Sequence, residues 1–101
     1  MATTSKTLFR GAATTTVGTT LYTVPSATTT IVTNIVVTNT TGTAGTYTIG
    51  LGGTNFATTV VVGANDSSVI DIKQVLTATQ TITGGASATT VNFHIAGVEI
   101  S

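Results

Sequence analysis

Apolar and polar side chains alternate along the chain in short runs, each bounded by Gly, Asn, Pro or Ser. The clearest run is 46–51, where Tyr47, Ile49 and Leu51 alternate with Thr and Gly. Alternation with a period of two places successive side chains on opposite faces of a strand, so these runs predict half-buried β-strands. We expect eight strands, at residues 7–10, 20–24, 28–38, 46–51, 58–62, 69–73, 79–83 and 89–100.

The segments between these runs are short and rich in turn-forming residues. Pro25, the single proline, has no backbone N–H and should therefore end a strand. Parallel strands need crossover connections of about a dozen residues or more, which are absent here, so the pairing should be antiparallel. The pattern predicts one all-β domain over residues 7–101, a β-sandwich of jelly-roll or Greek-key type. Residues 1–6 are small and polar, and we expect them to form a flexible arm. Turns are expected at 40–45, 52–55 and 63–66, with a flexible one at 84–87.

The run 28–38 is the longest and carries apolar residues on both of its faces. Ile31 and Ile35 share one face, and Val32 and Val36 share the other. This pattern favours a strand that is covered on both sides for part of its length. The core that we expect comprises Leu21 or Tyr22, Val24, Ile31, Ile35, Val37, Tyr47, Ile49, Leu51, Ile70, Ile72, Leu76, Ile82, Val91, Phe93 and Ile95.

The last run contains an interruption of its alternation. Phe93 and Ile95 share one face, whereas strict alternation would place Val98 and Ile100 on the opposite face. One extra residue beside Gly97 would restore a continuous apolar face, and Gly is common at such positions. We therefore predict a β-bulge or bend at Gly97.

Composition excludes several classes of protein. Thr, Val and Ile make up 48 of the 101 residues, and β-branched side chains favour strands over helices. The absence of Cys excludes a disulfide framework and a thiolate metal site. The apolar runs are too short to span a membrane or to form a signal peptide. Three cations are too few for a nucleic-acid surface, so we expect neither nucleic acid nor a membrane as a partner.

Charge is the most informative property of the chain. Charged residues make up 6% of the sequence and the net charge is zero. Soluble monomers normally keep their net charge away from zero and place charges on the edges of their sheets. We infer that much of the surface is covered by other copies of the chain or by a larger assembly.

His94 is the single histidine, and it could be combined with Ser67, Ser68, Asp66 or Asp71 as a nucleophilic triad. The sequence has no Gly-x-Ser-x-Gly nucleophile elbow and no other local feature of such a site. One His with scattered carboxylates is also too few ligands for a metal site. We therefore expect no enzyme activity, no catalytic residues, no cofactor and no metal.

An interface is the use that we favour for His94. It is expected to point away from the core, on the same face as Asn92, while Lys6 and Arg10 lie near the start of the chain. The candidate interface residues are Lys6, Arg10, Asn92 and His94.

Two further sequence patterns are expected to carry no function. Asn39-Thr40-Thr41 and Asn65-Asp66-Ser67 match the N-glycosylation pattern, which arises by chance in a chain so rich in Thr. Thr-x-Thr elements recur without a fixed interval, whereas ice binding and solenoid folds need regular spacing.

Three segments in this order, LYTVP (21–25), NIVVTN (34–39) and HIAGVEI (94–100), carry a family resemblance. The chain resembles small β-sandwich virion proteins of tailed bacteriophages, described as head decoration, minor structural or tail-associated proteins. The resemblance covers residues 7–101. It implies a jelly-roll-like fold, symmetric oligomers and docking onto capsid or tail proteins, and it supplies no catalytic residues.

The function we expect is that of a capsid decoration or cement protein in the virion, assembled in the cytoplasm of a bacterial host. Such a protein binds the outer shell and stabilises it by bridging coat subunits. Its expected partners are the major capsid protein or another virion protein, and itself, as a homotrimer. The alternatives are a tail, collar or fibre component, and a stand-alone sugar- or ice-binding module.

Overall fold

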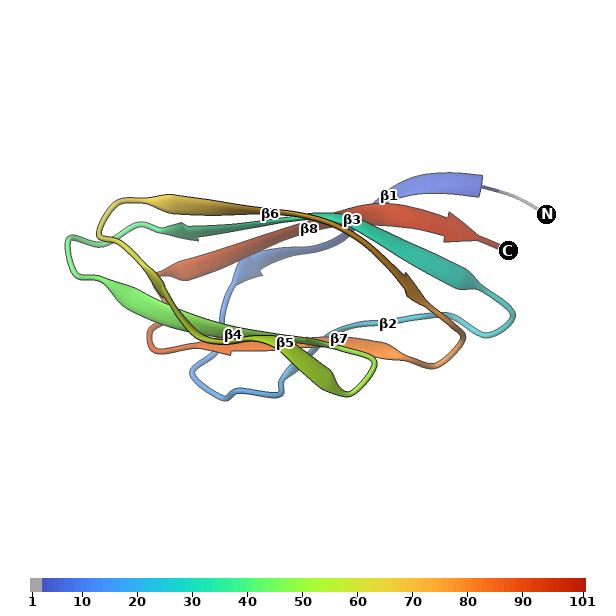
Figure 1. The fold of residues 1–101 in the computed structure, drawn as a ribbon, viewed down its shortest axis with the longest axis horizontal. Helices are drawn as coiled ribbons and strands as arrows, with labels where there is room; N and C mark the ends of the chain where they lie inside the picture. Colours follow the sequence, from blue (N-terminus) through green and yellow to red (C-terminus); the bar gives the residue numbers. More distant parts are fainter. Residues whose placement is uncertain (1–2) are drawn as a thin grey trace.

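The computed structural model describes residues 3–101, which form eight strands in two layers and contain no helix (Figure 1). Each of the eight expected strands is present, with bounds that differ from the expected ones by a few residues. The strands are β1 (Thr3–Ala12), β2 (Thr20–Thr23), β3 (Thr29–Asn39), β4 (Gly45–Leu51), β5 (Thr54–Val62), β6 (Ser67–Leu76), β7 (Thr81–Ala86) and β8 (Val91–Ile100). No helix that could cross a membrane occurs within the described residues.

The two layers are four-stranded antiparallel sheets. The first sheet has the order β1-β8-β3-β6 and the second has the order β2-β7-β4-β5. Strand β1 therefore pairs with β8, β2 with β7, β3 with β6 and β4 with β5. This nesting of strand pairs is the arrangement of a jelly roll, in which one long hairpin is rolled into two sheets. The prediction of an antiparallel β-sandwich is confirmed, and the topology selects its jelly-roll form.

The core lies between the sheets, and most of the expected core residues are buried there. Leu21, Tyr22 and Leu51, together with Ile70 and Ile72, are only partly buried and pack against it. The buried apolar residues are Leu8, Ala13, Val24, Val32, Ile35, Val37, Tyr47, Ile49, Val62, Leu76, Ile82, Ala86, Val91, Phe93 and Ile95.

The prediction that Ile31 lies in the core is wrong, because β3 contains a bulge. Thr33 is an extra residue between Val32 and Asn34, whose partners on β8 are consecutive residues. The bulge shifts the alternation by one position, so Val32 is fully buried and Ile31 lies on the outer face of the first sheet. A bulge of this kind changes which residues face the core without any change in the apolar pattern.

The predicted bulge at Gly97 is also wrong in its position. The alternation of β8 continues through Gly97, and the extra residues belong to the neighbouring strands, Leu8 in β1 and Thr33 in β3. A Cβ atom at Gly97 would overlap the carbonyl oxygen of Ile31 and lie 2.8 Å from the Leu8 side chain. Glycine is needed here because the backbones approach closely. Since the alternation of β8 is unbroken, Val98 faces outward.

The prediction of a flexible turn at 84–87 is wrong as well, because Gly84, Gly85 and Ala86 form the buried end of β7. Segment 13–19 connects the two sheets and runs along this end. Two backbone N–H groups of β7 donate to carbonyl oxygens of the segment at 2.9 Å. A Cβ atom at Gly85 would lie 2.5 Å from the carbonyl oxygen of Thr16, so the glycines permit the close approach.

The expected N-terminal arm is part of the sandwich. Residues 3–6 form the first half of β1 and pair with residues 97–100 of β8. The described part of the expected arm is therefore a strand with exposed side chains, and residues 1 and 2 lie outside the described residues.

The expected turns at 52–55 and 63–66 and the strand end before Pro25 fall close to where they were predicted. Gly52 and Gly53 both have positive φ and join β4 to β5 as a two-residue hairpin turn, while residues 54 and 55 already belong to β5. β2 ends at Thr23, two residues before Pro25.

Asn39 joins two loops at one end of the sandwich. Its side chain is 2% exposed, and its amide N–H groups donate to the carbonyl oxygens of Thr43 at 2.8 Å and Gly63 at 3.3 Å. Its side-chain oxygen accepts a hydrogen bond from the N–H of Thr41 at 3.3 Å. Its buried position agrees with the expectation that the glycosylation pattern at this residue arises by chance.

Candidate functional site

The outer face of the first sheet is an ordered grid of side chains. Directly paired residues of antiparallel strands point to the same side of a sheet, so the strand registers define rows across this face. One row places Val75, Ile31 and Val98 side by side on β6, β3 and β8. This face carries apolar side chains as expected for β3, but no described residue of the chain covers it.

A second row contains two of the candidate interface residues. Arg10 of β1 pairs with His94 of β8, which pairs with Val36 of β3, which in turn pairs with Val69 of β6. Asn92 lies one position further along the same face of β8 and pairs with residue 38 of β3. The prediction that Asn92 and His94 share an outward face is confirmed by this register.

A shallow hollow of about 400 Å³ lies on this face over β1, β8 and β3. Ala96 is a small residue among larger neighbours, which leaves room there. We call this feature the outer hollow. The outer hollow is lined by Arg10, Asn34, Val36, Thr38, His94, Ile95 and Ala96.

Lys6, the fourth candidate interface residue, is not part of this group. It pairs with Gly97, whose face points inward, and its Nζ atom lies 3.4 Å from a carboxylate oxygen of Glu99. Glu99 also accepts a hydrogen bond from the hydroxyl of Tyr22, which is hydrogen-bonded to the Thr30 hydroxyl at 2.9 Å. Lys6 therefore takes part in a polar cluster that joins β1, β8, β2 and β3.

This cluster changes the titration of two of its members. Burial, and the hydrogen bond to Glu99, raise the pKa of Tyr22 above its usual value of 10.0. The hydrogen bond from Tyr22, with a smaller contribution from Lys6, holds the pKa of Glu99 below its usual value of 4.5. The arrangement therefore favours a neutral phenol that donates to an ionised carboxylate, as expected of a structural contact.

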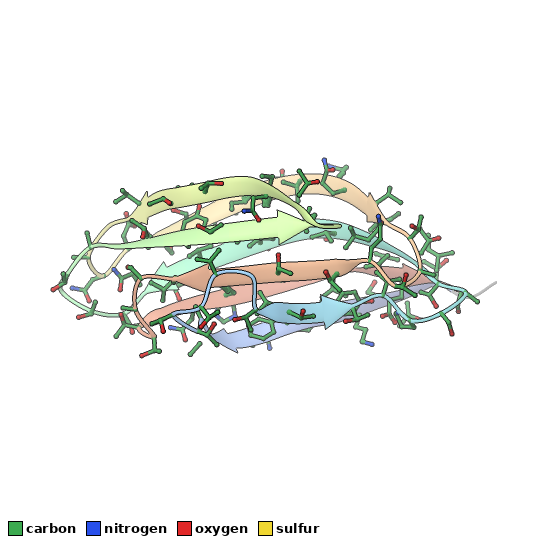
Figure 2. The ribbon with its side chains drawn as sticks, turned by 90° about the horizontal axis from the view of Figure 1, so that it is seen from below. Atoms are coloured by element: carbon green, nitrogen blue, oxygen red, sulfur yellow. The ribbon has the colours of Figure 1, made fainter. Side chains whose placement is uncertain are left out.

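The long side of the sandwich formed by β5 and β6 is its most apolar exposed region. Figure 2 shows these two strands along one side of the molecule, opposite β1 and β2. Of the six large hydrophobic residues that are exposed in the described part of the chain, all but Val17 lie on these two strands. We call these five residues the β5–β6 rim. The rim consists of Phe56, Val60, Val61, Val69 and Val75.

The four edge strands are protected to different degrees. β1 carries Lys6 and Arg10, β6 carries Asp71 and Lys73, and β2 has only four residues before the chain reaches Pro25. Charges, short length and proline are common ways to keep a sheet edge from associating. β5 has nine residues with neither charge nor proline, and only two register shifts in its pairing with β4 interrupt its edge.

The residues of the conceivable nucleophilic triad are not brought together. β3 lies between β6, which carries Ser67, Ser68 and Asp71, and β8, which carries His94. Two strand spacings separate these side chains by roughly 10 Å, beyond hydrogen-bonding distance. Within residues 3–101, no group of three or more His, Cys, Asp or Glu side chains is placed to hold a metal ion.

The sequence reasoning missed the β5 half of the rim. A signal was present, because residues 54–62 combine Phe, Thr and Val without any charge. Only the sheet order reveals that this run forms an edge strand, since the run alone is equally compatible with a central one. No protein-family model matches the chain, and the comparisons with curated proteins and with solved structures found no match.

Proposed function

We propose that the chain is a virion structural protein that decorates the outer shell of a bacteriophage capsid. The observation that carries this proposal is the β5–β6 rim, five large apolar side chains that the fold of the chain leaves exposed. Exposed apolar patches of this kind mark interaction surfaces. The near absence of charge and the resemblance of three sequence segments to phage virion proteins support the same function.

In this function the chain acts as a structural protein that bridges subunits rather than as a catalyst. Bound at a junction of the shell, it bridges neighbouring coat subunits and adds buried area to contacts that resist internal pressure. The exposed half of β1, residues 3–7, pairs with β8 on one side only. Its free edge suits strand addition to a coat subunit.

Imaging of assembled particles tests this proposal. Particles that carry the chain with a small fused label are examined by electron microscopy, and many copies distributed over the head are expected. A few copies at a single vertex would instead identify a tail, collar or fibre component, and unlabelled particles would contradict a virion role.

A deletion tests the role of the first strand half. Removal of residues 1–6 is expected to lower the occupancy of the chain on particles, while the matched substitution Lys6→Ala removes the ion pair and leaves the strand. If occupancy is unchanged by the deletion, residues 1–6 have no part in docking.

A further inference from the structure

The outer face of the first sheet is one continuous surface with an uneven distribution of charge. Arg10 and His94 lie side by side near its β1 edge, where the strand register pairs them directly. Asp71 lies on β6 at the opposite edge, beside Asn34 of β3. Three strand spacings separate β1 from β6, about 14 Å, so Asp71 is too far from Arg10 to form an ion pair with it. The guanidinium group of Arg10 is therefore not neutralised by the acidic residue of its own face.

The polar side chains that line the outer hollow have no partners within residues 3–101. In this part of the chain the ion pair joins Lys6 to Glu99, and the side-chain hydrogen bonds involve none of the polar residues of the hollow. Asn92, on the same face but outside the hollow, does donate to the carbonyl oxygen of Thr90. The polar residues of the hollow are Arg10, Asn34, Thr38 and His94.

The shape of the outer hollow suits a side chain that a larger molecule presents. Its volume is about 400 Å³, but it is a shallow feature of a sheet face. Small-molecule sites are clefts that bury most of the surface of their ligand, which a shallow hollow does not do. Val36 and Ala96 give the hollow apolar walls, and these suit the methylene groups of a protruding side chain. The fitting occupant is therefore part of another protein rather than a free small molecule.

The lining of the hollow selects a carboxylate at the tip of that side chain. A guanidinium group can donate two parallel hydrogen bonds to a carboxylate, and an imidazole N–H can donate a further one. Arg10 and His94 supply these donors side by side, and the lining contains no acidic residue. Asp71 repels a carboxylate from the β6 side, so the charge of the occupant belongs over β1 and β8.

From these observations we propose that the outer hollow binds an acidic segment of another protein, with a glutamate side chain seated between Arg10 and His94. The row of these two residues continues through Val36 to Val69, which is 67% exposed. An extended segment that crosses the strands presents every second side chain to the sheet, at intervals of about 6.7 Å. Apolar residues two and four positions from the glutamate then lie over Val36 and Val69. This inference goes beyond the proposed function, because it concerns the isolated chain and requires no capsid.

Titration of the isotope-labelled chain with a synthetic peptide tests the proposal. The peptide has five residues and capped ends, with a glutamate followed by alternating threonine and valine, and the control peptide has glutamine in place of glutamate. NMR chemical shifts of the backbone amides report where each peptide binds. We expect the glutamate peptide to shift the amides of residues 34–38 and 94–96, with a dissociation constant about tenfold below that of the glutamine peptide.

Variants of the chain separate the charge of the hollow from its shape. Arg10→Gln should raise the dissociation constant of the glutamate peptide about tenfold and leave that of the glutamine peptide unchanged. Ala96→Leu fills the hollow and should abolish the binding of both peptides. Lys73→Gln is the matched control, because Lys73 is an exposed cation of β6 that does not line the hollow, and its effect should be less than about twofold. The dispersion of the amide shifts checks that each variant is folded.

Several results would overturn the proposal. These are no binding at millimolar peptide, equal binding of the two peptides, shifts confined to residues outside the hollow, and equal effects of Arg10→Gln and Lys73→Gln. Light scattering of the purified chain tests the other possible occupant, a second copy of the chain. If Arg10→Gln lowers the mass of the free protein, a second copy fills the hollow and the assignment to an acidic segment of another protein is overturned.

Discussion

The two long sides of the sandwich, that of β1 and β2 and that of β5 and β6, differ in how well the chain itself covers them. On the side of β1 and β2, segment 13–19 hydrogen-bonds to β7, and the cluster of Tyr22 and Glu99 links four strands. On the side of β5 and β6, half-buried Ile70 and Ile72 approach the surface and the rim residues are exposed. The fold of the chain closes the first side, whereas on the second side it leaves large apolar side chains exposed.

The largest loss of unfolding free energy is expected on the closed side, that of β1 and β2. Gly85→Ala places a Cβ atom 2.5 Å from the backbone carbonyl of Thr16, which cannot move without displacing segment 13–19. We expect a loss of about 3 kcal/mol of unfolding free energy from this overlap, measured by urea denaturation. The control is Gly42→Ala, where a Cβ atom meets nothing within 4 Å and the change should stay within about 1 kcal/mol. Equal effects of the two substitutions would show that segment 13–19 is not tightly packed.

The next largest loss of unfolding free energy is expected at Asn39, which joins the loop before β4 to the loop after β5. Asn39→Ala leaves the carbonyl oxygens of Thr43 and Gly63 without their buried donor. Since unsatisfied buried polar groups are costly, we expect a loss of about 2–3 kcal/mol in urea denaturation. Asn92→Ala is the matched control, because Asn92 is partly exposed and its amide donates only to the carbonyl of Thr90 at 3.3 Å. If Asn92→Ala proved the more damaging change, Asn39 would not be the structural residue that its contacts indicate.

A smaller effect is expected at the polar cluster of the closed side. Tyr22→Phe removes the hydrogen bonds to Thr30 and Glu99, at a cost of about 1 kcal/mol at neutral pH.

The same cluster predicts a dependence on pH. The pKa of Glu99 is lower in the folded chain than its usual value of 4.5, so its carboxylate is favoured by folding. This contribution is fully present above pH 4.5 and is lost as the pH falls through the lowered pKa. Urea denaturation at neutral and at acid pH should therefore show a smaller acid-induced loss of unfolding free energy in Tyr22→Phe than in the unaltered chain. An unchanged acid response would exclude Tyr22 as the cause of the shift.

The smallest effect on folding is expected at the rim. Val61 is 66% exposed, so Val61→Thr should change the unfolding free energy of the monomer by no more than about 0.5 kcal/mol. The same substitution at fully buried Val91 should cost about 2 kcal/mol, because it buries a hydroxyl group in the core. A comparable loss at both positions, in denaturation of the monomer, would mean that Val61 is covered within its own chain.

The candidate site was predicted only in part. Because Asn92 and His94 are two residues apart on one strand, their common face follows from alternation alone. Arg10 joins them through the pairing of β1 with β8, and Lys6 is directed elsewhere because Leu8 forms a bulge between the two cations. The bulge reverses the face of one cation relative to the other, which local alternation cannot reveal.

The sequence by itself determined the fold class, the eight strands and most of the core, because period-two alternation of β-branched residues is a local property that survives in any pairing. Tertiary structure alone decided the bulges at Leu8 and Thr33, the close approach at Gly85, the burial of Asn39 and the exposure of the rim. These features depend on which distant strand lies alongside, and the order of strands in a sheet is set by the cooperative packing of the whole chain.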